Sequence, residues 1–175
     1  QYAKARDSYL LAIETGFDTA YLYRNLAISF ERLDEDEQAE LHFKGALARN
    51  PDDPFTLNYL GYWWAESGRH LTQAIELIEQ AVRLRPDSGF FVDSLGWVHY
   101  QLGNYQLAVE FLEKATMLEP EDAVIIAHLG DAYWRTNRYN EAQYKWRYAA
   151  QISEDSALQA ALENKLSSGF PMVGQ

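Results

Sequence analysis

Residues Asp93 to Pro120 read DSLGWVHYQLGNYQLAVEFLEKATMLEP, and the order of small, aromatic, glycine and proline residues in this stretch recurs along the chain. One set of alanines repeats at intervals of 34, 35, 34 and 34 residues: Ala5, Ala39, Ala74, Ala108 and Ala142. A second set repeats at 34, 35 and 34 residues: Leu26-Ala27, Leu60-Gly61, Leu95-Gly96 and Leu129-Gly130. Two independent sets with one period predict a chain built from structural repeats.

Each period contains two stretches with apolar residues at helical spacing, which predicts a pair of helices joined by a short turn. The turn holds Gly103 in the quoted stretch, and the equivalent positions are Asp34, Gly68 and Asn137, residue types that tolerate the left-handed conformation that ends a helix. A proline follows the second helix in three periods, at Pro51, Pro86 and Pro120. The small residues are expected where the two helices of a pair cross: Ala27, Gly61, Gly96 and Gly130 on the first helix, and Ala39, Ala74, Ala108 and Ala142 on the second.

A helix-turn-helix repeat with this period and these small residues resembles the tetratricopeptide repeat. The resemblance implies an all-α fold, a right-handed α-solenoid of antiparallel helix pairs. We predict the second helix of a truncated repeat at 1–18, repeats at 19–53, 54–88, 89–122 and 123–154, a capping helix at 155–167 and a flexible tail at 168–175. The chain is therefore expected to be part of a longer protein.

The composition excludes several classes of protein. The chain is 47% hydrophobic and 14% aromatic, which is typical of a folded protein. A formal charge of −11 repels phosphates, so nucleic acid is not an expected partner. There is no cysteine for a disulfide or a thiolate metal site. No run of about eighteen apolar residues occurs, so no membrane insertion is expected.

No motif indicates catalysis, a cofactor or a metal ion. The four histidines (His42, His70, His99 and His128) lack the spacing that places two ligands on one helix face. The acidic run Asp34 to Glu37 lacks the glycine that a calcium loop requires, and a helix start explains it better. Glycine-rich phosphate loops and the G-x-S-x-G nucleophile motif are absent. We expect a non-enzymatic protein.

A solenoid of helix pairs offers a concave surface lined by the first helix of each pair. Once the packing positions are removed, these helices leave the predicted groove residues: Arg24, Ile28, Phe55, Asn58, Tyr59, Tyr62, Phe90, Asp93, Ser94, Trp97, Tyr100, Gln101, Ala127, Asp131, Trp134 and Arg135. Aromatic residues mixed with Asn, Asp and Arg are typical of protein-binding hot spots. We therefore expect a protein or peptide partner.

An alternative is that some of these aromatic residues only pack between repeats. Packing is the favoured interpretation for Trp63, Trp64, Tyr133 and Trp146, and the groove is favoured for Tyr62, Trp97, Tyr100 and Trp134. A further alternative is self-assembly into a homodimer or a larger homo-oligomer, through the aromatic surface or through apolar residues of the first helix such as Tyr2, Tyr9 and Ile13.

The resemblance also bears on the partner. Some tetratricopeptide domains grip the C-terminal carboxylate of chaperones with lysine, arginine and asparagine side chains. Arg24 could stand for the first lysine, but Ile28, Tyr59, Phe90 and Ser94 occupy the other positions, so chaperone tails are disfavoured. The repeats are similar to those of long proteobacterial proteins, some of them envelope lipoproteins that bring proteases and substrates together. This similarity suggests an adaptor in the cell envelope or periplasm and leaves the cytoplasm open.

Overall fold

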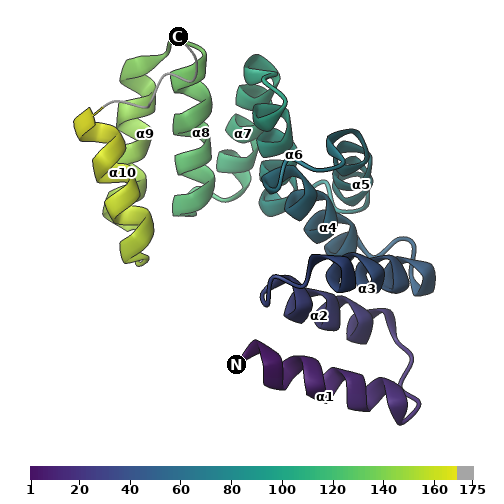
Figure 1. The fold of residues 1–175 in the computed structure, drawn as a ribbon. Helices are drawn as coiled ribbons and strands as arrows, with labels where there is room; N and C mark the ends of the chain where they lie inside the picture. Colours follow the sequence, from purple (N-terminus) through teal and green to yellow (C-terminus); the bar gives the residue numbers. More distant parts are fainter. Residues whose placement is uncertain (169–175) are drawn as a thin grey trace.

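The computed structural model describes residues 1–168, which form helices joined by short turns (Figure 1). The helices of this part are α1 (Tyr2–Glu14), α2 (Ala20–Glu31), α3 (Asp36–Arg49), α4 (Pro54–Glu66), α5 (Leu71–Leu84), α6 (Gly89–Gln101), α7 (Tyr105–Leu118), α8 (Ala123–Arg135), α9 (Tyr139–Ile152) and α10 (Ser156–Ser168). Within these residues no helix combines the length and the apolar character that crossing a membrane requires. The flexible tail was predicted at 168–175; residue 168 ends α10, and the rest of the tail lies outside the described residues.

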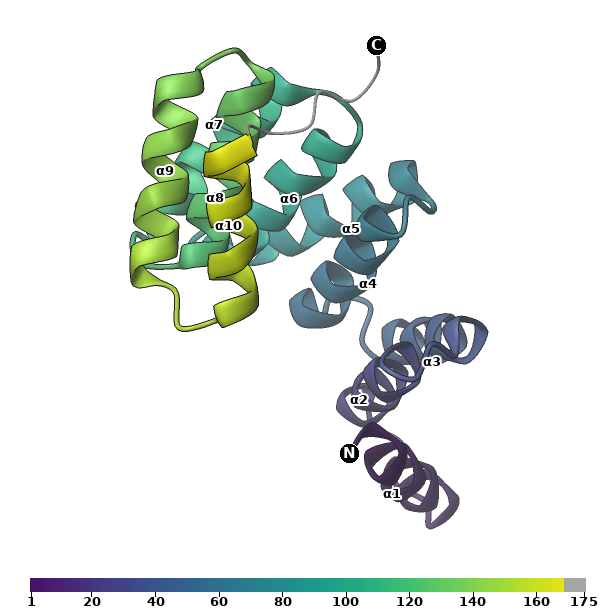
Figure 2. The same cartoon turned by 60° about the vertical axis from the view of Figure 1, so that its left-hand side comes forward.

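The helices form antiparallel pairs that stack in chain order into a curved array. The pairs are α2 with α3, α4 with α5, α6 with α7, and α8 with α9. Figures 1 and 2 show the array running from α1 at one end to α9 and α10 at the other. Helix α1 packs on α2, and α10 packs on α9. The predicted all-α solenoid of helix pairs is therefore confirmed for residues 1–168.

The turn inside each pair has the conformation that its residue type predicts. Asp34, Gly68, Gly103 and Asn137 have φ angles of 58°, 65°, 79° and 63°. This left-handed geometry lets the chain reverse immediately after the first helix. The second pair has one extra residue here, and His70 also takes a positive φ of 49° before α5 begins.

The starts of three first helices are capped by side chains. Thr19 accepts a hydrogen bond from the Leu22 N–H at 3.3 Å, and Asp53 accepts one from the Thr56 N–H at 3.2 Å. Asp122 accepts from the N–H groups of two residues of α8. These caps satisfy N–H groups that have no partner inside the helix.

Small residues sit at the crossing points of the pairs. A Cβ atom added to Gly61 would lie 2.6 Å from Cγ1 of Ile78, and one added to Gly96 would lie 2.7 Å from Cγ of Leu112. In the first pair, Ala27 and Ala39 are both fully buried. The predicted packing role of these positions is confirmed, since a larger side chain would separate the helices.

Candidate functional site

The predicted groove residues all lie on or at the end of the first helices, α2, α4, α6 and α8, but they differ in exposure. The exposed residues are Phe55, Phe90 and Gln101. The half-buried residues are Arg24, Ile28, Asn58, Tyr59, Tyr62, Trp97, Trp134 and Arg135. The buried residues are Asp93, Ser94, Tyr100, Ala127 and Asp131.

The five buried residues correct the predicted groove, because their side chains do not form an exposed surface. Tyr100 is 8% exposed and is covered by Trp97 and by the edge of the Tyr105 ring. Asp131 is 4% exposed and is enclosed by α9 and α10, where it accepts hydrogen bonds from Trp146 and Lys165. The helical spacing predicted which residues share one face of each first helix. It did not predict which of those residues the side chains of neighbouring helices cover.

The packing interpretation concerned four residues, and three of them are buried. Trp64 and Tyr133 are each 6% exposed, and Trp146 is fully buried. Trp63 is half-buried: its ring packs against the core 5.9 Å from the Phe43 ring centre, and the guanidinium of Arg69 lies 4.6 Å from the centre of its ring.

Three rings from two neighbouring repeats stack on one another. The Trp97 ring lies between His128, at a centroid distance of 4.1 Å, and Tyr100, at 4.7 Å. The Trp97 indole N–H donates to a carboxylate oxygen of Glu66 on α4. Arg135 donates from Nε to the Tyr100 hydroxyl at 3.2 Å. We call Trp97, Tyr100 and His128 the aromatic stack; it joins side chains of α6 and α8, and its bond to Glu66 ties it to α4.

His128 of the aromatic stack also forms an ion pair with Asp93. Nδ1 of His128 lies 2.9 Å and 3.1 Å from the two carboxylate oxygens of Asp93. Burial by itself would lower the pKa of His128, but the adjacent Asp93 carboxylate outweighs burial and the pKa is raised. Sequence reasoning treated His128 as an ordinary histidine. Its position 35 residues after Asp93, one repeat further on, was the available signal, since residues one period apart occupy neighbouring repeats.

The ion pair predicts a pH dependence of stability. Because the pKa of His128 is raised in the folded protein, its stabilising contribution is complete below the unfolded value of about 6.5 and is lost as the pH rises through the folded value. The difference in free energy of unfolding between the native protein and His128→Gln should therefore shrink between about pH 6 and about pH 8.5. Urea denaturation of both proteins at both pH values measures this difference in free energy of unfolding.

His99 provides the matched control, because burial lowers its pKa. Its contribution to stability runs in the opposite sense and is lost as the pH falls. The difference between the native protein and His99→Gln should therefore grow over the same rise in pH. If both histidine variants changed in the same direction, the interpretation of the Asp93–His128 pair would be wrong.

A depression of about 260 Å³ lies between α2 and α4. Its lining consists of aromatic rings bordered by charged groups: Glu31, Arg32, Tyr59, Tyr62, Trp63 and Glu66. The Tyr59 hydroxyl donates to a Glu31 carboxylate oxygen at 3.1 Å, and burial together with this carboxylate raises the pKa of Tyr59 to about 12. Burial also raises the pKa of Tyr62. Both phenols therefore stay protonated near neutral pH, and the depression can accept a side chain on apolar walls with charges at its rim.

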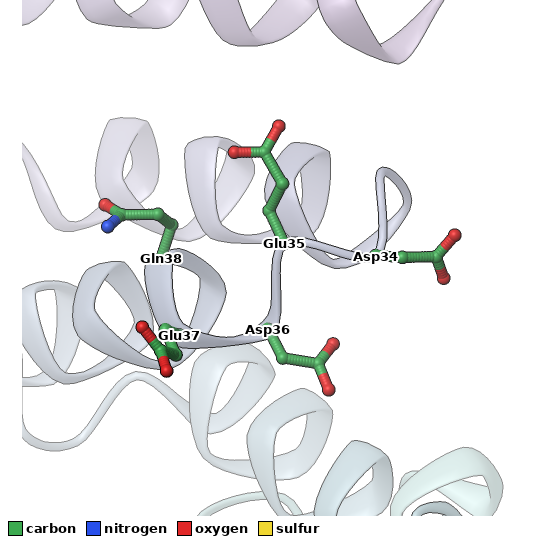
Figure 3. Close-up of a pocket in the computed structure, with 5 residues that line it drawn as sticks. All are labelled: Asp34, Glu35, Asp36, Glu37 and Gln38. Atoms are coloured by element: carbon green, nitrogen blue, oxygen red, sulfur yellow. The ribbon is translucent and has the colours of Figure 1, made fainter.

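The acidic run at the start of α3 does not gather into an ion-binding site. Figure 3 shows that Glu35 and Glu37 point in opposite directions and that the carboxylates of the run do not converge on one point. Glu35 pairs with Arg6 at 2.9 Å, and Asp36 pairs with a second arginine at 3.2 Å. Among residues 1–168 there is no cluster of three or more His, Asp or Glu side chains that could hold a metal ion.

Comparison with known sequences agrees with the repeat pattern. A family model described as tetratricopeptide repeat matches residues 99–143. The TPR repeat-containing protein PA4667 of Pseudomonas aeruginosa is 36% identical over 86 residues, which cover 49% of this chain and 14% of that protein. The Photosystem I assembly protein Ycf3 of Synechococcus elongatus is 29% identical over 114 residues, which cover 56% of this chain and 65% of that protein. The chain thus spans less than two thirds of either relative.

Comparison with solved structures agrees with the fold. A tetratricopeptide protein of Thermus thermophilus superposes with a TM-score of 0.81, covering 94% of this chain and 90% of that one at 22% identity. This likeness concerns the architecture alone. The repeat period, the small residues at the helix crossings and these matches agree: residues 99–143 match the tetratricopeptide repeat, and the chain as a whole resembles tetratricopeptide repeat proteins.

Proposed function

We propose that this chain is a non-enzymatic scaffold that binds a segment of a partner protein across its first helices. The observation that carries the proposal is the aromatic depression between α2 and α4, where Tyr59, Tyr62 and Trp63 are only half-buried. Aromatic side chains that keep exposed surface on a folded protein are typical anchors of protein interfaces. The tetratricopeptide fold is generally a protein-interaction fold without catalytic activity, which supports the same interpretation.

The bound segment would continue from the depression toward the aromatic stack. Glu66 lines the depression and also accepts the hydrogen bond of Trp97, so it connects the two places. Rings that are already held in position lose little side-chain entropy when a partner binds. The polar groups at the rim would orient the backbone of the segment by hydrogen bonds.

The proposal predicts that Tyr62→Ala/Trp97→Ala weakens partner binding by about 1–2 kcal/mol or more while the helical content is kept. The native protein and the variant would be used for affinity capture from cytosolic and envelope fractions of a bacterial extract, followed by mass spectrometry. The dissociation constant of each captured protein would then be measured. Tyr144→Ala, which removes a tyrosine that is 65% exposed on α9, is the control and should bind as the native protein does.

Equal partner binding by the double variant and the control would exclude the groove as the binding site. Self-assembly is the competing function, and α1 supports it with two exposed apolar residues, Tyr2 and Leu11. Light scattering separates the two functions, because a concentration-dependent dimer that Leu11→Ser abolishes would favour self-assembly.

The name of the cyanobacterial relative, Photosystem I assembly protein, makes a subunit of a larger complex a candidate partner.

A further inference from the structure

Four apolar residues are exposed at the same place in four successive repeats. They are the second residues of the first helices, spaced 34, 35 and 34 apart, and they are 63%, 54%, 53% and 47% exposed: Tyr21, Phe55, Phe90 and Val124. We call this set the apolar ladder. Single exposed apolar residues are normal, but exposure at the same position in four consecutive repeats is not.

Four carboxylates accompany the apolar ladder with the same spacing. Each lies three residues before its apolar residue, in the turn that leads into the helix: Asp18, Asp52, Asp87 and Glu121. All four are exposed. We call them the acidic ladder. Each carboxylate carries a negative charge that exceeds the roughly half positive charge at the start of its helix, and arginines offset this charge at Asp18 and Asp87 but not at Asp52 and Glu121.

Contacts within the folded chain account for only part of the two ladders. Three of the four helix starts are capped by other residues, Thr19, Asp53 and Asp122. Asp18 pairs with Arg49, and Asp52 accepts a hydrogen bond from Gln80 at 2.8 Å, whereas Glu121 has no ion-pair partner among the described residues. Asp87 lies 3.5 Å from Arg85, an exposed pair of the kind that contributes little to stability. The exposed area of the apolar ladder gains nothing from folding, because it remains in water.

The first two members of the apolar ladder are joined by Arg24. Its guanidinium carbon lies 5.3 Å from the Tyr21 ring centre and 5.6 Å from that of Phe55, while Nη1 pairs with Asp53 at 2.7 Å. The edge of the Phe55 ring contacts Phe91 of the next repeat at a centroid distance of 5.6 Å. These contacts hold the rings in place and still leave more than half of Tyr21 and Phe55 exposed.

We infer that the two ladders bind a basic amphipathic helix of a partner protein. Its apolar face would lie on the apolar ladder, and its lysine or arginine side chains would face the acidic ladder. The inference rests on the proposed scaffold function and specifies the chemistry of the partner. Charge argues against a second copy of this chain as the occupant, because a copy would bring another acidic ladder and a net charge of −11.

The spacing of the repeats suits a helix. Helix α4 contacts α6, and α6 contacts α8, so these three first helices are direct neighbours. Packed helices lie about 8–10 Å apart. Seven residues of a helix rise about 10 Å, so apolar residues at heptad spacing return to one face at about the interval of the ladder.

The test uses three labelled synthetic peptides of about 20 residues, long enough to span three repeats. One has leucine at heptad spacing among lysines, the second replaces the lysines with glutamate, and the third replaces the leucines with serine. Fluorescence anisotropy is recorded with the full chain at about 0.15 M salt, where distant charges are screened. We expect the lysine–leucine peptide to bind at least about ten-fold more tightly than either of the others.

Matched variants locate the binding. Phe55→Ser/Phe90→Ser and Asp52→Lys/Asp87→Lys should each weaken binding of the lysine–leucine peptide at least about ten-fold. The controls make the same kinds of change on second helices: Leu41→Ser/Tyr144→Ser for the exposed apolar residues, and Glu76→Lys/Glu110→Lys for the exposed carboxylates. Both control pairs should bind the peptide as the native chain does.

Four outcomes would overturn the inference: no binding of the lysine–leucine peptide, equal binding of the glutamate–leucine peptide, equal weakening by the control pairs, or a dimer of the native chain that Phe55→Ser/Phe90→Ser dissolves. Binding of the captured partner to the variants shows whether the ladder inference fails alone or together with the proposed function. If Tyr62→Ala/Trp97→Ala releases the partner and the ladder variants retain it, the groove stands and the ladders do not bind. If neither set releases it, both fail.

Discussion

Replacing Trp146 with alanine is expected to lower the free energy of unfolding by about 3–5 kcal/mol, the loss typical of a fully buried aromatic side chain. Trp146 is 0% exposed and lies where α8, α9 and α10 meet. Its indole N–H donates to Asp131 at 2.9 Å, and Nζ of Lys165 lies 5.7 Å from its ring centre. Alanine would leave a cavity under α10 and remove one of the hydrogen bonds to a buried carboxylate.

Trp146→Phe is the matched control, because it keeps an aromatic ring and removes only the N–H and part of the volume. Asp131 would retain Lys165 at 2.7 Å, so we expect a smaller loss of about 1–3 kcal/mol. Urea denaturation followed by circular dichroism measures both variants. Because each repeat contacts only its neighbours, amide hydrogen exchange should show the loss of protection mainly in α8, α9 and α10. Equal losses for the two variants would contradict this account.

Replacing Gly96 with leucine is expected to lower the free energy of unfolding by about 3 kcal/mol through overpacking. A Cβ atom at this position would lie 2.7 Å from Cγ of Leu112 and 3.3 Å from the Leu112 backbone N. Leu112 is fully buried, so it cannot move aside without disturbing α7. At an exposed helix position, the same change would stabilise the helix by up to about 1 kcal/mol, so the sign of the effect is diagnostic.

Ala48→Leu on α3 is the control for this second variant. Ala48 is exposed, so added bulk meets solvent, and we expect a change within about 0.5 kcal/mol. Urea denaturation and melting temperature would be compared for both leucine variants. A melting temperature of Gly96→Leu equal to that of the native chain would show that α6 and α7 do not cross at Gly96.

Much of the fold was predictable, because the features that define it are local. The turn residues Asp34 and Gly103 act on their own backbone, and their residue types indicate the left-handed conformation before any tertiary contact is known. The small residues were predictable for a related reason. A glycine such as Gly61 in the middle of a helix is unfavourable, so its recurrence at one period indicates close packing of another helix.

The candidate site was less predictable, because exposure depends on neighbouring repeats. Tyr59 and Tyr100 both lie on the predicted groove faces of their helices, yet one borders an open depression and the other is covered. The difference comes from the side chains that surround them, including the Trp97 ring that stacks on Tyr100. The apolar ladder was half recognised, since Phe55 and Phe90 were predicted and Tyr21 and Val124 were not.

The sequence by itself determined the repeat, the helix pairs and the positions of close packing, since periodicity and local conformation carry that information. Only the tertiary structure decided which side chains meet across repeats. The Asp93–His128 pair and the burial of Asp131 beneath α10 depend on residues 35 and 34 positions apart. The physical reason is that neighbouring side chains decide whether a charge is stabilised and whether an aromatic ring is exposed. In stacked helix pairs many of those neighbours belong to other repeats.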